Sequence, residues 1–123
     1  MFTFSKIERL CSKTAIDALF LGGKSKTQFP IKLIYKLAEF ESPFPIRAMF
    51  VVPKKKHKRA NKRNIIKRRM REVYRLNKQM LYDSFTNAKY DIMFVYLSTE
   101  ESEYSLIEDK MKALIKQLAE KPI

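Results

Sequence analysis

Residues 54–75 read KKKHKRANKRNIIKRRMREVYR, and twelve of these 22 residues are Lys or Arg, while Glu72 is the one acid. The stretch therefore carries +11 of the chain's formal charge of +13, and the other residues are nearly balanced. Like charges packed this tightly repel one another and cost stability. Their concentration indicates a polyanionic partner that neutralises them.

The same stretch predicts one amphipathic helix over residues 60–77. At about 100° per residue, one arc of this helix holds Arg63, Asn64, Lys67, Arg68, Arg71 and Arg75. The opposite arc holds the apolar residues Ile65, Ile66, Met70, Val73 and Leu76, which we expect to pack on a sheet. Lys62 and Arg69 intrude on the apolar arc, where their long stems can lie along apolar surface.

Strands are expected on both sides of this helix. Apolar residues alternate over 29–37, and apolar runs fill 46–52 and 89–97. Ser12 is expected to cap a first helix, which Gly22 and Gly23 end in a left-handed conformation. A last helix is expected over about 102–119.

This order of elements predicts an α+β fold: a two-layer sandwich with a mixed sheet of about four strands and helices on one face. The basic helix would form a βαβ crossover between two parallel strands. Such crossovers are usually right-handed, but the sequence leaves the hand open.

Composition limits the remaining possibilities. A chain of 123 residues with 46% hydrophobic and 12% aromatic residues is expected to form a single domain, 1–123, with a packed core. It has no apolar run long enough for a membrane span and no start typical of a secretory signal. One cysteine, Cys11, and one histidine, His57, exclude an internal disulfide and a structural zinc site, so we expect a reducing cytoplasm.

The basic helix could face solvent alone, a membrane surface, duplex DNA or folded RNA. A merely solvated face does not account for twelve ordered cations, and the apolar arc lacks the exposed Trp or Phe of a membrane anchor. Reading bases in the DNA major groove favours a few residues at a helix N-terminus, whereas here the cations continue for four turns. Folded RNA, contacted along its phosphates, is the preferred class.

Several segments of the chain resemble one known protein family. Residues 63–72, RNIIKRRMRE, resemble the R-N-x-x-K-R-x-x-R-E signature of the bacterial ribonuclease P protein component. The upstream residues VPKKK (52–56) and KRA (58–60) resemble the segment that precedes this signature. KIERL (6–10), then LF (19–20) and GKS (23–25), resemble the start of the family, and KYDI (89–92) resembles its late strand.

Two positions depart from the family pattern. Ile65 stands where members often have Arg, and Arg69 stands where they often have an apolar residue. Either the helix is slightly rotated, or Arg69 reaches RNA from the flank. Ile16 also stands where another family aromatic is common, so stacking would be lost there.

The resemblance implies a protein subunit of ribonuclease P, which hydrolyses one phosphodiester bond to remove the 5′ leader of precursor tRNA. The catalyst would be an RNA subunit that uses Mg²⁺, with no catalytic or metal-binding residue in the protein. One protein would bind one catalytic RNA, together with precursor tRNA and away from membranes. The residues expected on RNA are Lys54, Lys55, Lys56, Lys58, Arg59, Lys62, Arg63, Asn64, Lys67, Arg68, Arg71 and Arg75.

In the family the leader lies in an aromatic-lined cleft between the first helix and the sheet, which makes Phe20 and Tyr35 the candidates here. Either side chain could instead belong to the core. His57 is expected to face RNA or solvent rather than act as a general base.

Two other functions stay open. A ribosomal or general structured-RNA-binding protein would also be basic and of this size, although it leaves the ordered signature unexplained. A protein-only nuclease would need several converging carboxylates, and Asp83, Asp91 and Asp109 are far apart in the sequence.

Overall fold

The computed structural model describes residue 4, residues 6–85 and residues 88–120. Its elements in chain order are η1 (Lys6–Glu8), α1 (Lys13–Gly22), β1 (Lys24–Gln28), β2 (Ile31–Ala38), β3 (Ile46–Val51), α2 (Ala60–Asn77), α3 (Gln79–Ser84), β4 (Lys89–Tyr96) and α4 (Tyr104–Glu120). The basic helix α2 has its predicted bounds, and β3, β4 and α4 lie within two residues of theirs. The short helix α3 was not predicted.

The four strands form one mixed sheet in the order β1-β2-β4-β3. β1 and β4 each pair antiparallel with β2, whereas β3 and β4 are parallel. β1 was not predicted, because its residues KSKTQ show no apolar alternation and it lies at an edge of the sheet. Lysine is common on edge strands because its charge discourages further pairing. Phe29 and Pro30 therefore belong to the turn between β1 and β2 rather than to a strand.

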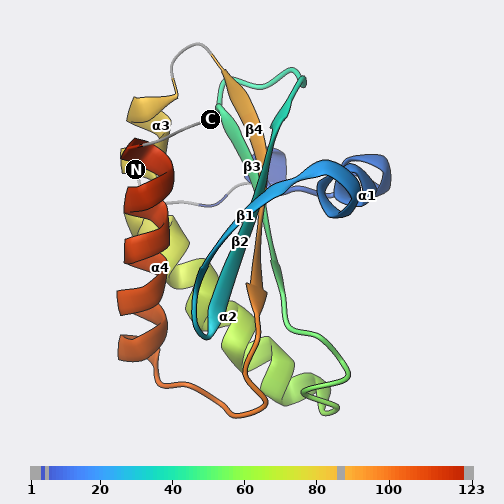
Figure 1. Ribbon diagram of the computed structural model, residues 1–123, viewed down its shortest axis with the longest axis vertical. Coiled ribbons are helices and arrows are strands. Elements are labelled where there is room, and N and C mark those ends of the chain that lie inside the picture. The colour runs from blue at the N-terminus through green and yellow to red at the C-terminus, as the bar shows by residue number, and fades with distance from the viewer. Residues whose placement is uncertain (1–3, 5, 86–87, 121–123) are drawn as a thin grey trace.

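The larger core lies between the sheet and the helices α2, α3 and α4, which cover one face as predicted (Figure 1). The alternating strand residues Ile31, Leu33 and Tyr35 point into it, as do Ile92 and Phe94. Burying one such large side chain stabilises the fold by about 1.5–3 kcal/mol relative to leaving it exposed. This layer is the main source of stability.

The first helix lies on the other side of the sheet, so the expectation of helices on one face does not hold for α1 (Figure 1). Ser12 caps it as predicted, because its hydroxyl accepts a hydrogen bond from the Ala15 amide at 3.3 Å. A smaller core forms beneath it from Leu10, Leu19, Ile34 and Met93. The sheet is therefore covered on both faces.

The glycine that follows α1 is explained by close packing rather than by a left-handed backbone. Gly23 has φ −75°, so the predicted left-handed end of α1 is wrong. A Cβ at this position would lie 2.5 Å from the Leu19 carbonyl oxygen and 2.8 Å from Ile34 Cγ2. Glycine thus lets the chain pass close to the sheet as it turns from α1 into β1.

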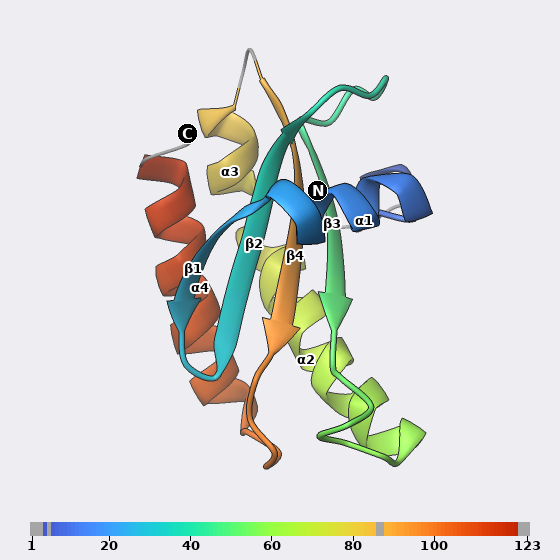
Figure 2. The ribbon, with the colours of Figure 1, turned by 45° about the vertical axis from the view of Figure 1, so that its right-hand side comes forward.

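The crossover from β3 through α2 to β4 is left-handed. In Figure 2, α1 faces the viewer, β3 and β4 both point down, β3 lies to the right of β4, and α2 lies behind the sheet. A path that descends β3, returns behind the sheet and descends β4 to the left has this hand, which is rare. Two constraints lead to this hand. β2 pairs with one edge of β4, so β3 pairs with the other edge. The crossover helix must also cover the face of the sheet on which Ile46, Ala48 and Phe50 of β3 enter the large core.

The segment before α1 is tied to both layers. The Leu10 amide donates to the Ala48 carbonyl at 2.8 Å, which covers part of the edge of β3. Glu8 is buried in an ion pair with Lys78 and accepts a hydrogen bond from the Tyr82 hydroxyl at 2.5 Å. Burial raises the pKa of Tyr82, so this hydroxyl stays protonated and donates.

Among the described residues, no helix has the length and apolarity that crossing a bilayer requires.

Candidate nucleic-acid interface

The loop between β3 and α2 leads into the N-terminal end of the basic helix (Figure 2). Its sequence, residues 52–59, contains five cations. All five predicted contact residues of this loop are exposed: Lys54, Lys55, Lys56, Lys58 and Arg59. The Lys56 ammonium donates to the Leu97 carbonyl, whereas the other four side chains have no hydrogen bond or ion pair within the described part of the chain. Four free cations are thus available to a polyanion.

The buried stripe of α2 is rotated relative to the prediction. Ile66, Met70 and Val73 are buried as expected, but Tyr74 is fully buried and Leu76 is 42% exposed. Because Tyr74 packs in the large core, the face of α2 that carries Tyr74 points toward the sheet. Ile65 therefore lies at the side of the buried stripe and is only half-buried.

This rotation sorts the predicted contacts of α2 into two groups. Four are exposed: Lys62, Asn64, Arg68 and Arg71. Three are half-buried: Arg63, Lys67 and Arg75. The exposed group forms the free cationic face of the helix, and the second group lies at its edge.

Two of the half-buried arginines have partners within the protein. Arg63 Nη1 donates to the carbonyl oxygens of His57 and Lys58, each at 2.9 Å, and so fixes the basic loop against the helix. Arg75 pairs with Glu72, and its hydrogen bond lowers the pKa of that carboxyl. Part of the charge counted in the sequence is therefore used to hold the surface in shape.

Arg69, one of the two departures from the family pattern, also has an internal role. Its Nη1 lies 2.9 Å from Glu101 Oε2 and 2.6 Å from the Ser102 carbonyl oxygen. It ties α2 to the segment that leads into α4. The two departures from the family pattern, an apolar residue at Ile65 and a charged one at Arg69, thus follow from the rotation of the helix and from the contacts of Arg69 with Glu101 and Ser102.

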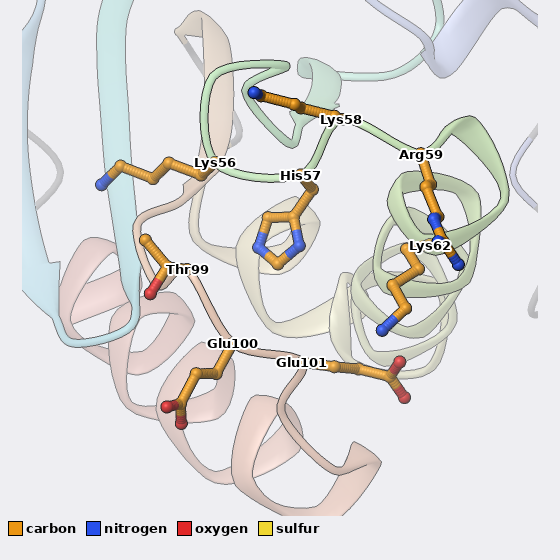
Figure 3. A pocket seen from close by; sticks show the side chains of 8 residues that line it. All are labelled: Lys56, His57, Lys58, Arg59, Lys62, Thr99, Glu100 and Glu101. Carbon is orange, nitrogen blue, oxygen red and sulfur yellow. The ribbon is translucent and has the colours of Figure 1, made fainter.

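His57 is buried, so the expectation that it faces RNA or solvent is wrong. Only 6% of it is exposed, its Nε2 lies 2.7 Å from the Ser98 carbonyl oxygen, and its ring packs against Tyr96. Figure 3 shows it between the cations of the loop and residues 99–101. A pocket of about 600 Å³ opens there, lined by Lys56, His57, Lys58, Arg59, Lys62, Thr99, Glu100 and Glu101.

A second concave site lies between α1 and the sheet. This groove of about 270 Å³ is lined by Leu19, Phe20, Gly23, Ser25, Lys32, Ile34, Val95 and Leu97. Phe20 is 63% exposed even though it is a large aromatic residue, so it is free to stack with a ligand. The structure therefore places this predicted residue at an accessible surface.

Tyr35 does not share that groove. It is 6% exposed and lies in the large core, on the face of the sheet opposite α1. The expectation that Phe20 and Tyr35 line one cleft is therefore wrong. The residue that faces α1 is its neighbour Ile34, while Lys32 on the same face went unrecognised because it interrupts an apolar run.

The donor set for a metal ion is missing from the described residues. In residues 4, 6–85 and 88–120, no three His, Cys, Asp or Glu side chains lie close enough together to hold a cation. Asp91, for example, is buried in a two-pronged pair with Arg47, at 2.8 and 2.9 Å.

Known proteins resemble this chain in sequence. A family model described as Ribonuclease P matches residues 4–119. A ribonuclease P protein component of Porphyromonas gingivalis is 35% identical over 118 residues, which cover 94% of this chain and 86% of that protein. One of Chlorobaculum tepidum is 45% identical over 73 residues, covering 56% and 47%.

The fold is also shared. The RNase P protein of Thermotoga maritima superposes with a TM-score of 0.72 at 24% identity, covering 89% of this chain and 96% of that one. A Staphylococcus aureus RNase P protein gives 0.69 at 18% identity, covering 89% and 94%. These solved structures therefore share the fold of this chain.

Proposed function

The chain belongs to the ribonuclease P protein family, and we propose that within that endoribonuclease complex it docks on the catalytic RNA and holds the 5′ leader of precursor tRNA. The observation that carries this proposal is the pairing of an ordered cationic surface with a separate groove that has an exposed aromatic residue. The two sites have the chemistry for two different parts of an RNA substrate complex.

The cationic surface suits the catalytic RNA. Its free members are Lys54, Lys55, Lys58, Arg59, Lys62, Arg68 and Arg71. Cations spread over a loop and several helical turns match a phosphate backbone better than they match base edges. Asn64 is exposed among them and can donate to a phosphate or a sugar. Arg63, Lys67 and Arg75 have the smaller part, because they lie at the edge of the surface.

The groove beside α1 suits the leader. A base stacked on Phe20 gains roughly 1–3 kcal/mol whatever its identity, which fits leaders of varied sequence. Mature tRNA has no leader, so this contact favours precursor over product. Such a preference speeds turnover because the product is released more readily.

Catalysis belongs to the RNA subunit in this proposal. Mg²⁺ held by that RNA would supply the activated nucleophile and stabilise charge at the scissile phosphate. The protein would lower the repulsion between two RNAs, because its cations neutralise phosphates where the RNAs approach each other. One protein per catalytic RNA, acting in the cytoplasm, completes the proposed assembly.

A cleavage assay tests the role in processing. The purified protein is added to its cognate catalytic RNA at low Mg²⁺, and removal of the leader from precursor tRNA is followed. Restored cleavage is the expected result. Tight RNA binding without restored cleavage would instead favour a general structured-RNA-binding protein, and cleavage without any RNA subunit would establish a protein nuclease.

A further inference from the structure

We propose that Lys32 binds a phosphate of the leader within the groove beside α1, next to the base that stacks on Phe20. The inference rests on the proposed function and adds a residue to it. The groove would then hold one nucleotide by two different contacts, an aromatic ring for the base and a cation for the backbone.

The lining of the groove leads to this assignment. Among the described residues that line it, Phe20 is the one aromatic residue and Lys32 the one charged residue, while the others are aliphatic or small. Its volume of about 270 Å³ lies just below the usual lower size of small-molecule pockets, roughly 300 Å³. That space suits one nucleotide unit rather than two stacked bases.

The strand register places Lys32 on the face that α1 covers. It lies opposite Thr27 of β1 and Val95 of β4, two residues before Ile34, whose side chain packs under α1. Lys32 is half-buried, and its ammonium has no hydrogen bond or ion pair among residues 4, 6–85 and 88–120. Its aliphatic stem can lie along Val95 while the ammonium stays without a partner. A phosphate that entered the groove would supply that partner through a charge-assisted hydrogen bond.

One hydrogen bond links a residue of the groove to the basic loop. Leu97 lines the groove, and its carbonyl oxygen accepts a hydrogen bond from the Lys56 ammonium. A strand of RNA leaving the cationic surface at Lys56 would therefore meet Lys32 next.

A walk of uncharged linkages along the leader tests the proposal. Precursor tRNAs are made with a single methylphosphonate at successive leader positions, and their affinity for the holoenzyme is measured with the native protein and with Lys32→Gln. The native protein should lose affinity at one or two adjacent linkages. Lys32→Gln should bind the unmodified precursor roughly 3- to 10-fold more weakly and be insensitive to those same linkages.

Two variants serve as controls. Lys24→Gln removes the same charge from the opposite face of the neighbouring strand, since Lys24 pairs with Tyr35, and it should leave the linkage profile unchanged. Phe20→Ala should weaken binding but keep the sensitivity at the same linkages. Together they separate a phosphate contact from general charge and from stacking.

The outcomes distinguish the inference from the function on which it rests. If Lys32→Gln stays as sensitive to the linkages as the native protein, the phosphate contact is overturned while leader binding stands. If the native holoenzyme binds precursor and mature tRNA equally, both leader binding and the role of Lys32 are overturned.

Discussion

The cationic surface of the loop and α2 differs from the groove beside α1 in how many residues share one task. The surface has seven free cations spread over a loop and several helical turns, so each one is partly replaceable. The groove has one aromatic and one charged residue in a space of about 270 Å³. The first should respond to salt and to the number of charges, whereas the second should respond to the identity of single side chains.

That difference reflects two kinds of physics. Attraction between a cationic surface and a polyanion comes mainly from released counterions, so it adds up over many charges and weakens with salt. Stacking and close packing act over short distances and depend on shape. If the two regions are separable in this way, substitutions in the cationic surface and in the groove should change different measured properties.

The largest effect is expected from removing three exposed cations together, Lys62, Arg68 and Arg71, by substitution with Ala. Affinity for the catalytic RNA should fall by roughly 10- to 1,000-fold, and the slope of log affinity against log salt should shrink by about three. Filter binding over a salt series measures both. A triple variant at Lys24, Lys112 and Lys116 removes the same charge elsewhere, and a similar loss there would show that net charge alone decides binding.

The next largest effect is expected at the aromatic residue of the groove. Phe20→Ala should weaken binding of precursor tRNA by roughly 1–3 kcal/mol and leave mature tRNA unaffected, because only the precursor has a base to stack. The neighbouring Leu21, 89% exposed and outside the groove, provides the control variant Leu21→Ala. Equal losses for precursor and mature tRNA would mean that Phe20 has no leader-specific role.

A change in the backbone beneath the groove should act through stability. Gly23→Ala puts a methyl group 2.5 Å from the Leu19 carbonyl, so it should destabilise the fold by at least about 1 kcal/mol. Urea unfolding measures this cost. Gly22→Ala is the matched control, because its new Cβ meets only Lys36 Cε at 3.5 Å. Identical midpoints for the two variants would contradict the packing account of Gly23.

The smallest effect is expected from two adjacent arginines. Arg68 is exposed, whereas Arg69 is paired with Glu101 and the Ser102 carbonyl. Arg68→Gln should lower the salt slope of RNA binding by about one. Arg69→Gln should leave the slope unchanged and lower stability by up to about 1 kcal/mol, as for a partly exposed ion pair. If Arg69→Gln lowers the slope as much as Arg68→Gln does, Arg69 reaches RNA.

Predictions from the sequence succeeded where the pattern is local. The bounds of α2 and the cap at Ser12 follow from periodicity and from the chemistry of a few neighbouring residues. β1 was missed because an edge strand of Lys, Ser, Thr and Gln has no buried face to mark it. Leu33, Ile34 and Tyr35 form an unbroken apolar run, so alternation could not tell which of them faces α1.

The sequence by itself determined the concentration of charge, the amphipathic helix that carries it and the family signature within that helix. Only the tertiary structure decided which side chains of the basic segment are free. The burial of Tyr74 sets the rotation of α2 about its axis, and the carbonyl oxygens of Ser98 and Ser102 bind His57 and Arg69. The tertiary structure likewise put Lys32 rather than Tyr35 beside Phe20. Charge and periodicity are properties of neighbours along the chain, whereas the face that a side chain occupies depends on which layers pack against the sheet.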